Sequence, residues 1–302
     1  MSGSFIERLL SFEIALGKGN FGESGTSTVT LSGYRAVVTI VKHGLGAFGQ
    51  AEIRIFGLDF NIMNQISTLG SSYLQATQRR NQVVINAGDA VNGMAQVFSG
   101  TIVMARADFT AAPDASFVIL AQTGLYFAMK PVSPLSFSGS VNVATIMSNI
   151  AAQMNVGFEN NGVSVILNNP YLPGTAYQQA AAAARAANIN WTIDAETGPL
   201  AIWNKGQSRG GKIPLYTPET GMIGYPSYTQ NGITVRAIYT PGNDPLMGGQ
   251  VQVQSSLQPA TGNWIVYAAT YELASQMPGG DWSMTLACQG LVQNATYGVP
   301  LS

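Results

Sequence analysis

Two glycine-rich segments have the spacing of a dinucleotide-binding loop, in which a helix N-terminus receives the pyrophosphate. They are residues 17–22 and 44–49. A strand-like run follows each segment, and neither has an acidic residue about 20 positions further on within a βαβ unit. We therefore expect turn glycines at both places and no bound dinucleotide.

The single histidine and the single cysteine, His43 and Cys288, lie far apart in the sequence. No two residues of these types have the spacing of metal ligands, and a Cys–His nucleophile would need the fold to bring the two together. Cys288 alternates with Trp282, Met284 and Leu286, which is typical of the apolar face of a strand. We predict an inert thiol, a histidine in a surface turn, and no metal ligand or cofactor.

Two carboxylate pairs, Asp194 with Glu196 and Asp108 with Asp114, are close enough in sequence to suggest a glycoside hydrolase. Their turn and loop contexts explain them equally well, because Asp commonly stabilises turns. A carboxylate hydrolase remains an alternative, but we predict no catalytic residue.

Trp191 and Trp203 lie in a predicted hairpin. Exposed aromatic residues can mark a binding surface, and these tryptophans or nearby tyrosines would then be the stacking platforms of a carbohydrate-binding adhesin. Burial statistics favour core packing for both side chains, so the adhesin remains the alternative.

The composition describes a folded protein with little charge. Of the 302 residues, 46% are hydrophobic and 10% are charged, and the formal net charge is −1. A disordered chain would combine low hydrophobicity with high net charge, so we expect more than one packed core. The 14 basic and 15 acidic residues leave no basic surface for tight nucleic-acid binding. So few charges suggest that partners cover much of the surface.

The termini and the cysteine content predict the compartment. One cysteine cannot form an internal disulfide, which favours folding in a reducing cytoplasm. The first ten residues lack the pattern of a signal peptide, and no stretch reaches the roughly 18 apolar residues of a membrane helix. We expect neither secretion by a signal peptide nor membrane insertion.

The first 112 residues read as one β domain. Leu10, Phe12 and Ile14 alternate with other residues, and strand-like runs follow at 28–31, 36–41, 51–56, 83–86 and 95–104. This spacing predicts an antiparallel sandwich or barrel. Asp59 is a candidate cap for a short helix closed by Gly70, with apolar residues at Ile62, Met63, Ile66 and Leu69.

Residues 136–205 change character and predict an inserted α+β module. Apolar residues recur at helical spacing after Asn142, and an alanine-rich helix follows Thr175, so both polar residues are candidate N-caps. Runs at 189–194 and 200–204 then predict a hairpin.

The C-terminal third returns to strand patterns, at 233–240, 250–255, 264–272 and 281–289. We assign the β-like run at 115–128, before the module, to the same domain. The second β domain is thus predicted to be split, with residues 113–135 before the module and 206–302 after it.

The most specific segment is residues 217–255, TPETGMIGYPSYTQNGITVRAIYTPGNDPLMGGQVQVQS. It resembles a segment of the baseplate hub proteins of contractile-tailed (myovirus-type) phages, which are related to late control protein D and to the hub part of type VI secretion spike proteins. The matching positions are a turn, the start of a strand, a second turn and the glycine before an alternating strand, namely Thr220, Gly221, Gly224, Pro226, Gly232, Pro241 and Gly249.

The closing hairpin also matches the family, through Gly280 and Trp282. The basic residue expected before this turn is absent, and Met277-Pro278 stands there instead. The resemblance covers most of the chain through its domain order but is sharp only over the last third.

The resemblance implies a mainly β fold with an α+β insert, consisting of two tail-tube-like antiparallel β-barrel or sandwich domains. It implies a structural protein of the virion, assembled in the host cytoplasm, that forms a homotrimeric ring between a hexameric tail tube and a trimeric central spike. Expected partners are the spike, tube or tube-initiator proteins, the tape-measure protein and baseplate wedge proteins, with DNA only in transit. A tail tube, tube-initiator or distal tail protein is the alternative within the same machine.

Overall fold

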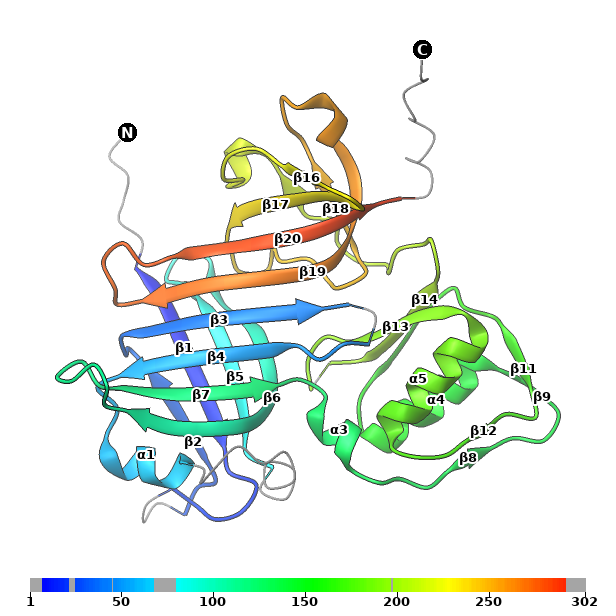
Figure 1. Cartoon of the computed structure of the whole chain (residues 1–302), viewed down its shortest axis with the longest axis horizontal. Helices are drawn as coiled ribbons and strands as arrows, with labels where there is room; N and C mark the ends of the chain where they lie inside the picture. Colours follow the sequence, from blue (N-terminus) through cyan, green and yellow to red (C-terminus); the bar gives the residue numbers. More distant parts are fainter. Residues whose placement is uncertain (1–6, 22–24, 45, 68–79, 197, 292–302) are drawn as a thin grey trace.

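A computed structural model describes residues 7–21, 25–44, 46–67, 80–196 and 198–291 (Figure 1). An antiparallel β body lies on the left of the view, and a smaller α+β module, Leu125 to Asn204, lies on the right. The β body contains β1 (Arg8–Ala15), β2 (Thr28–Ser32), β3 (Ala36–His43), β4 (Gln50–Phe56), α1 (Phe60–Ile66), β5 (Gln82–Asp89), β6 (Gly93–Asp108), β7 (Ser116–Gln122), β15 (Leu215–Tyr216), η2 (Pro218–Thr220), β16 (Ser227–Thr229), β17 (Gly232–Ile238), β18 (Gln250–Val253), η3 (Gln258–Ala260), β19 (Gly262–Ser275) and β20 (Trp282–Gly290).

Alternating apolar residues form the strands of the β body and cover its core. On β1, Leu10, Phe12 and Ile14 are buried while the residues between them are more exposed. On β20, Trp282, Met284, Leu286 and Cys288 point into the core, as their alternation predicts. The predicted cap of α1 is confirmed, because Asp59 accepts a hydrogen bond from the backbone amide of Asn61. Leu69 and Gly70 lie outside the described residues.

One sheet runs through the whole β body. Its strand order is β16-β17-β20-β19-β3-β4-β7-β6-β5-β1-β2, with β18 beside β19 and β15 beside β18. The sheet bends so that β1 and β5 lie behind β3 and β4, and a single apolar core fills the space between the layers (Figure 1). β2 and β16 are the outermost strands, and no described residue pairs with the outer side of either. The sheet is therefore an open sandwich and not a closed barrel.

The seam between the two ends of the chain is the pairing of β3 with β19. It runs in register from Ala36 opposite Ser275 to His43 opposite Ala268. Ile40 on β3 lies opposite Tyr271 on β19, and both are fully buried. The N-terminal and C-terminal strands thus share both a hydrogen-bonded sheet and a core.

β7 lies within the sheet between β4 and β6. The run at 115–128 was assigned to the second β domain, but β7 pairs on one side with β4 and on the other with β6. The end of that run is also helical, as α3 (Leu125–Met129). Because one sheet crosses both predicted β domains, hydrogen bonding alone does not divide them, and the domain boundaries stay a prediction.

The module has its own core, built on capped helices. It contains α3 (Leu125–Met129), β8 (Leu135–Ser136), β9 (Ser140–Asn142), α4 (Val143–Met154), β10 (Phe158–Asn161), β11 (Ile166–Asn168), β12 (Tyr171–Leu172), α5 (Ala176–Ala187), β13 (Ile189–Ile193) and β14 (Leu200–Asn204). Asn142 caps α4, and Thr175 forms a capping box with Gln178 on α5, so both predicted caps are confirmed. β13 and β14 form the predicted hairpin, although Thr197 in its turn lies outside the described residues.

The mainly β fold with an α+β insert is confirmed. The small sheet β10-β14-β13 packs its Ile202 face against the helices, within a core that is distinct from that of the β body. Trp203, next along β14, is absent from the helix-facing core and lies beside Gly248 of the β body.

Candidate functional site

The residues with catalytic potential are dispersed, and each of the acidic ones has a structural contact. Asp108 accepts a hydrogen bond from Thr110 and Asp114 pairs with Arg35, both near the turn between β6 and β7. Asp194 and Glu196 lie instead where the module meets the β body. The two predicted carboxylate pairs therefore serve as turn and interface contacts.

His43 and Cys288 do not form a reactive pair. His43 is exposed at the end of β3, whereas Cys288 is fully buried on β20, two strands away. Burial raises the pKa of the Cys288 thiol to about 12, so the thiol is protonated and unreactive near neutral pH. No group of three potential metal ligands occurs among the described residues. Within the same residues, no helix is long and apolar enough to cross a membrane.

The two tryptophans of the module pack against glycines of the β body. A Cβ atom at Gly46 would lie 2.7 Å from the ring of Trp191, and one at Gly248 would lie 2.3 Å from the ring of Trp203. Any side chain at either position would overlap the ring. Trp191 and Trp203 are 6% and 1% exposed, so the prediction of core packing is confirmed and neither offers a face for stacking a sugar.

A buried carboxylate adds a polar contact to this interface. Glu196, in the turn of the module's hairpin, accepts hydrogen bonds from Thr101 on β6 at 2.7 Å and Gln82 on β5 at 3.3 Å. Burial raises the pKa of Glu196, while these bonds, the backbone of Tyr126 and the charge of Arg80 oppose that rise. The module therefore docks a buried carboxyl group whose pKa lies above its ordinary value.

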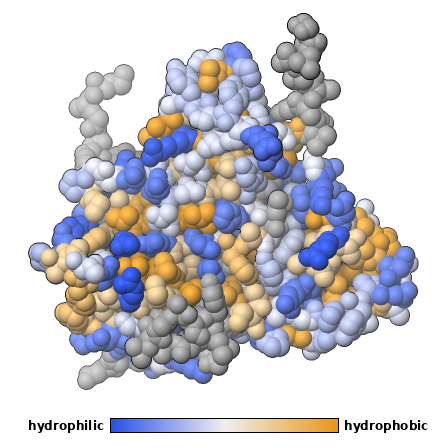
Figure 2. Space-filling model, viewed as in Figure 1, coloured by the Kyte–Doolittle hydropathy of each residue, from blue (hydrophilic) through white to orange (hydrophobic). Residues whose placement is uncertain are grey.

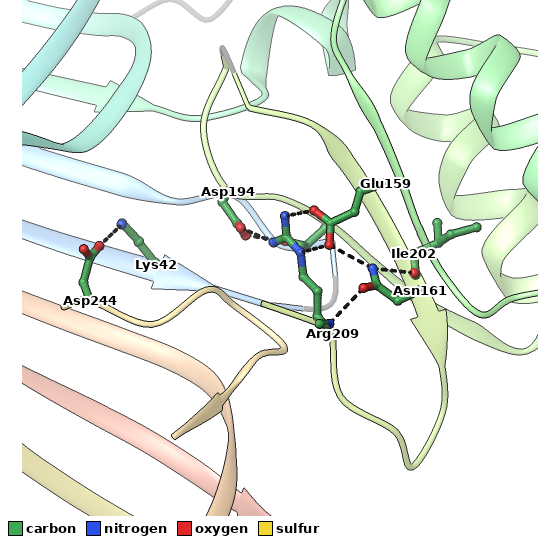
Figure 3. A network of polar contacts seen from close by, with 9 residues as sticks. Lys42, Glu159, Asn161, Asp194, Ile202, Arg209 and Asp244 are labelled. Atoms are coloured by element: carbon green, nitrogen blue, oxygen red, sulfur yellow. Dashed lines mark hydrogen bonds and ion pairs between the residues drawn. The ribbon is translucent and has the colours of Figure 1, made fainter. Parts of the chain in front are cut away.

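Arg209 forms the second polar contact, shown in Figure 3. Its side chain, 2% exposed, donates to both carboxylate oxygens of Glu159, at 2.8 and 2.6 Å, and to Asp194. Its backbone amide donates to the carbonyl of Gly248 at 2.7 Å. Arg209 thus joins two carboxylates of the module to the backbone of the β body.

The carboxylates and the guanidinium stabilise one another's charged forms. Hydrogen bonds from Arg209 lower the pKa of Glu159, although burial opposes this. Burial alone would lower the pKa of Arg209, but Glu159 and Asp194 raise it. A neighbouring residue, Asn161, completes the network by donating to Glu159 and accepting from the amide of Gly210.

A hollow of about 260 Å³ lies beside this network, between the module and the β body. Lys42 and Asp244 line it from the β body, and Asp194 and Ala195 line it from the module. Lys42 pairs with Asp244 at 3.6 Å, on the opposite side of Asp194 from the Glu159 contact (Figure 3). The interface is therefore incompletely packed at this point.

The motif residues of the C-terminal third build turns around β17. Thr220 accepts from the amide of Thr217 and donates to the carbonyl of Leu215, and Gly221 ends η2. The chain then runs beside β17 through Met222 and Ile223, turns at Gly224, and enters β16 after the buried Pro226.

The remaining motif positions hold neighbouring strands together. Gly232 opens β17 so close to β20 that a Cβ atom would lie 2.2 Å from the carbonyl oxygen of Cys288. Pro241 follows β17, Gly249 accepts from the amide of Val266, and Gly280 lies in the turn before β20. Trp282 is buried and donates its indole N–H to the carbonyl of Tyr239.

Exposed apolar side chains gather near this region. Eight of the fifteen exposed large hydrophobic residues in the described part of the chain lie between Ile213 and Leu257. Tyr228 on β16 lies opposite the buried Ile233, yet it is 59% exposed because the sheet ends there. Figure 2 shows apolar and hydrophilic residues mixed over one face of both parts. A sheet edge of this kind is suited to contact with another protein.

Sequence reasoning missed Arg209, Glu159 and the two glycines that receive the tryptophans. The basic, glycine-rich run 205–212 indicated a loop but no partner for Arg209. Gly46 belongs to one of the two dinucleotide-like segments, so its glycine was noticed but assigned only to a turn. Nothing in the local sequence singles out Glu159.

Solved structures with this fold are tail and secretion proteins. A tail protein from Neisseria meningitidis MC58 superposes with a TM-score of 0.59 at 10% identity, over 93% of this chain and 96% of the other. The c3393 protein of E. coli, a type VI secretion component described as similar to the T4 tail proteins gp27 and gp5, gives 0.57 at 9% identity, over 89% and 76%. The 43 kDa tail protein of prophage MuSo2 from Shewanella oneidensis gives 0.54 at 7% identity, over 94% and 98%.

No curated protein sequence matches the chain significantly. Residues 20–285 match the family described as baseplate hub gp41, whose members are structural proteins and not enzymes. The match covers most of the chain, from before β2 into β20. With a tail-protein fold and a family match of this extent, the chain belongs to the baseplate hub gp41 family and is a structural component of a phage tail.

Proposed function

We propose that the protein forms a homotrimeric ring in the baseplate of a contractile phage tail, joining the hexameric tube to the trimeric spike and letting DNA pass during ejection. Three copies with two tube-like β regions each would present six similar surfaces to the tube. The two regions are those predicted from the sequence, 1–112 and 113–135 with 206–302. The partners in this proposal are the spike, tube or tube-initiator, tape-measure and wedge proteins of the same virion, assembled in the host cytoplasm.

The observation that carries this proposal, beyond the family, is the open sheet with two different outer strands. When one edge strand of a subunit pairs with the other edge strand of the next subunit, the contact is heterologous. Repeated heterologous contacts form a closed ring if the rotation between neighbouring subunits divides a full turn. β16 is short, fully exposed and flanked by the exposed Tyr225, whereas β2 is longer and half covered. Natural proteins rarely leave such edges unprotected without a partner.

Two variants, each of which places a lysine at an exposed apolar position, test whether β16 is an interface edge. Tyr228→Lys places a charge on β16, and Val91→Lys places one in the turn between β5 and β6, where Val91 is 73% exposed. We mix each variant with the spike and tube proteins of the same phage and image the products by electron microscopy. We expect rings of three for the wild type and for Val91→Lys, and no rings for Tyr228→Lys. A wild-type chain that stays monomeric and binds neither partner contradicts it.

A tail tube, tube-initiator or distal tail protein remains the second candidate from the same machine. A tube protein would stack as rings of six, so the subunit count in the images separates the two functions. The adhesin alternative loses the two module tryptophans as stacking platforms, because both are buried against glycines.

A further inference from the structure

The module and the β body have separate apolar cores and are joined by two chain crossings. The core of the module begins at Phe127 and ends at Ile202, and that of the β body contains none of its residues. The chain enters the module after β7 and leaves it after β14. No strand of the described module pairs with a strand of the β body. Parts joined in this way can move relative to each other without unfolding.

The contacts that hold the module in place form a short set. Trp191 and Trp203 occupy the spaces over Gly46 and Gly248, and the ring of Tyr177 packs 4.8 Å from that of Phe48. Glu196 and Arg209 supply the buried polar contacts already described. The hollow of about 260 Å³ beside Asp194 leaves part of the interface unpacked.

Arg209 differs from the other contacts because it lies on the crossing itself. Ser208 accepts from the side chain of Gln250 on β18, and the amide of Arg209 donates to Gly248, so the backbone here is tied to the β body. The guanidinium reaches back to Glu159 and Asp194 of the module. The amide of Gly210 also donates to the module, at Asn161.

Glycines with positive φ stand at both crossings. Gly206 and Gly211 flank Arg209, with φ of 77° and 118°, and Gly124 precedes α3, with φ of 80°. Hinges in proteins are a few loop or element-terminal residues that absorb changes in φ and ψ. The places where the chain would have to bend therefore coincide with residues that bend at low energetic cost.

We propose that the module is a hinged rigid body and that Arg209 is the latch that fixes its orientation on the β body. With the latch closed, one guanidinium pairs with two partly buried carboxylates, which reduces their mutual repulsion, and holds the crossing against the module. Without it, Glu159 and Asp194 repel each other, and the crossing is held only by its backbone contacts with Gly248 and Asn161 and by the contact of Ser208 with Gln250. The module then turns about the two glycine-containing crossings, while its own core and the sheet stay intact.

Hydrogen exchange of the isolated full chain, followed by mass spectrometry, tests the latch. In Arg209→Met we expect exchange to rise by roughly tenfold to a hundredfold at positions 209 and 210, whose amides bond to Gly248 of the β body and to Asn161 of the module. Helices α4 and α5 should keep their protection. Unchanged exchange at the interface would show that Arg209 is no latch, and equal loss of protection in α4 and α5 would show that there is no rigid hinged module.

The matched control is Arg236→Met. Arg236 also contacts two carboxylates, Glu272 at 3.9 Å and Asp281 at 3.3 Å, but it is 46% exposed and lies within the β body. It should leave the interface unchanged. An equal rise at the interface in this variant would overturn the assignment to Arg209.

A rescue variant keeps the test decisive if Arg209→Met folds poorly. Combining it with Glu159→Gln and Asp194→Asn removes the repulsion along with the latch, so exchange in the module core should return to the wild-type level. Arg209→Lys keeps one cation but loses the two-pronged contact, and it should give an intermediate rise. A lysine variant with wild-type exchange at the interface would contradict the geometry proposed here. None of these measurements depends on ring assembly.

Discussion

Two junctions hold this protein together, and they are built differently. The β3–β19 seam joins strands from opposite ends of the chain through backbone hydrogen bonds over one continuous core. The junction between the module and the β body has no strand pairing among the described residues. Its contacts include two rings over glycines, the ring contact of Tyr177 with Phe48, and the buried side chains of Glu196 and Arg209. The first kind of junction makes two regions one folding unit, whereas the second leaves two units that can separate.

The largest expected effect is at the seam. Ile40→Ala removes a fully buried side chain opposite Tyr271 and should lower the free energy of unfolding by about 3 to 4 kcal/mol. Because the core is shared, β5 and β20 should lose protection from exchange at the same urea concentration. Val91→Ala, at a 73% exposed position, should change little. Loss of protection in β5 and β20 at different urea concentrations would show that the two ends of the sheet do not form one folding unit.

At the second junction, replacing a glycine that lies against a tryptophan ring should lower the stability of docking. Gly248→Ala places a Cβ atom 2.3 Å from the buried ring of Trp203 at a φ of 79° and should weaken docking of the module by about 2 to 3 kcal/mol. Gly242→Ala is the control, since its φ is 71° but nothing lies within 4 Å. It should cost about 1 kcal/mol. Hydrogen exchange in urea, followed separately for peptides of the module and of the sheet, measures the loss of stability in both variants. Equal losses for Gly248→Ala and Gly242→Ala would show that packing of Trp203 does not depend on the missing side chain at Gly248.

The pH dependence of docking should reveal the buried carboxyl group. Burial raises the folded-state pKa of Glu196, so its contribution is fully present below the ordinary Glu pKa and declines as pH rises through the folded value. Glu196→Gln should therefore be more stable than the wild type at pH 8, with the difference vanishing near pH 4. Thermal unfolding across this range measures it, and a variant destabilised more at pH 8 than at pH 4 would reverse the assignment.

The same measurement on Glu159→Gln should have the opposite sign. Arg209 lowers the folded-state pKa of Glu159, so the contact stabilises above the ordinary Glu pKa and is lost as pH falls through the folded value. The variant should be less stable than the wild type at neutral pH and similar to it in acid. With Glu159 about one third exposed, we expect a loss of about 1 kcal/mol.

The smallest effect should come from an exposed ion pair. Asp114→Asn breaks the ion pair with Arg35. The side chains of Arg35 and Asp114 are 36% and 69% exposed, so the substitution should change the free energy of unfolding by at most about 0.5 kcal/mol. Urea denaturation measures this. A loss above 1 kcal/mol would mean that charges outside the interface matter as much as those inside it.

Local chemistry explains what could be predicted from the sequence. The caps at Asn142 and Thr175, the hairpin after α5 and the buried face of Cys288 depend on neighbours within a few residues, and all were predicted correctly. The pairing of β3 with β19 joins residues more than 200 positions apart, and no local pattern encodes it. The pairing of β7 with β4 likewise joins residues at least 60 positions apart, and no local pattern indicates it.

The interface was least visible in the sequence. Arg209 and Glu159 are brought together by the fold of the module, and a charged residue in a glycine-rich loop normally indicates only an exposed turn. The glycines beneath Trp191 and Trp203 owe their identity to rings more than forty residues away. The family resemblance, by contrast, depended on the order of turns and strands in 217–255, which the sequence displays directly.

The role as a baseplate hub is tested most directly by imaging the intact tail with this chain labelled. Cryo-electron microscopy of particles carrying a tag on the chain should show three copies at the end of the tube nearest the spike. Six copies along the tube, or a position away from the tube axis, would contradict the account.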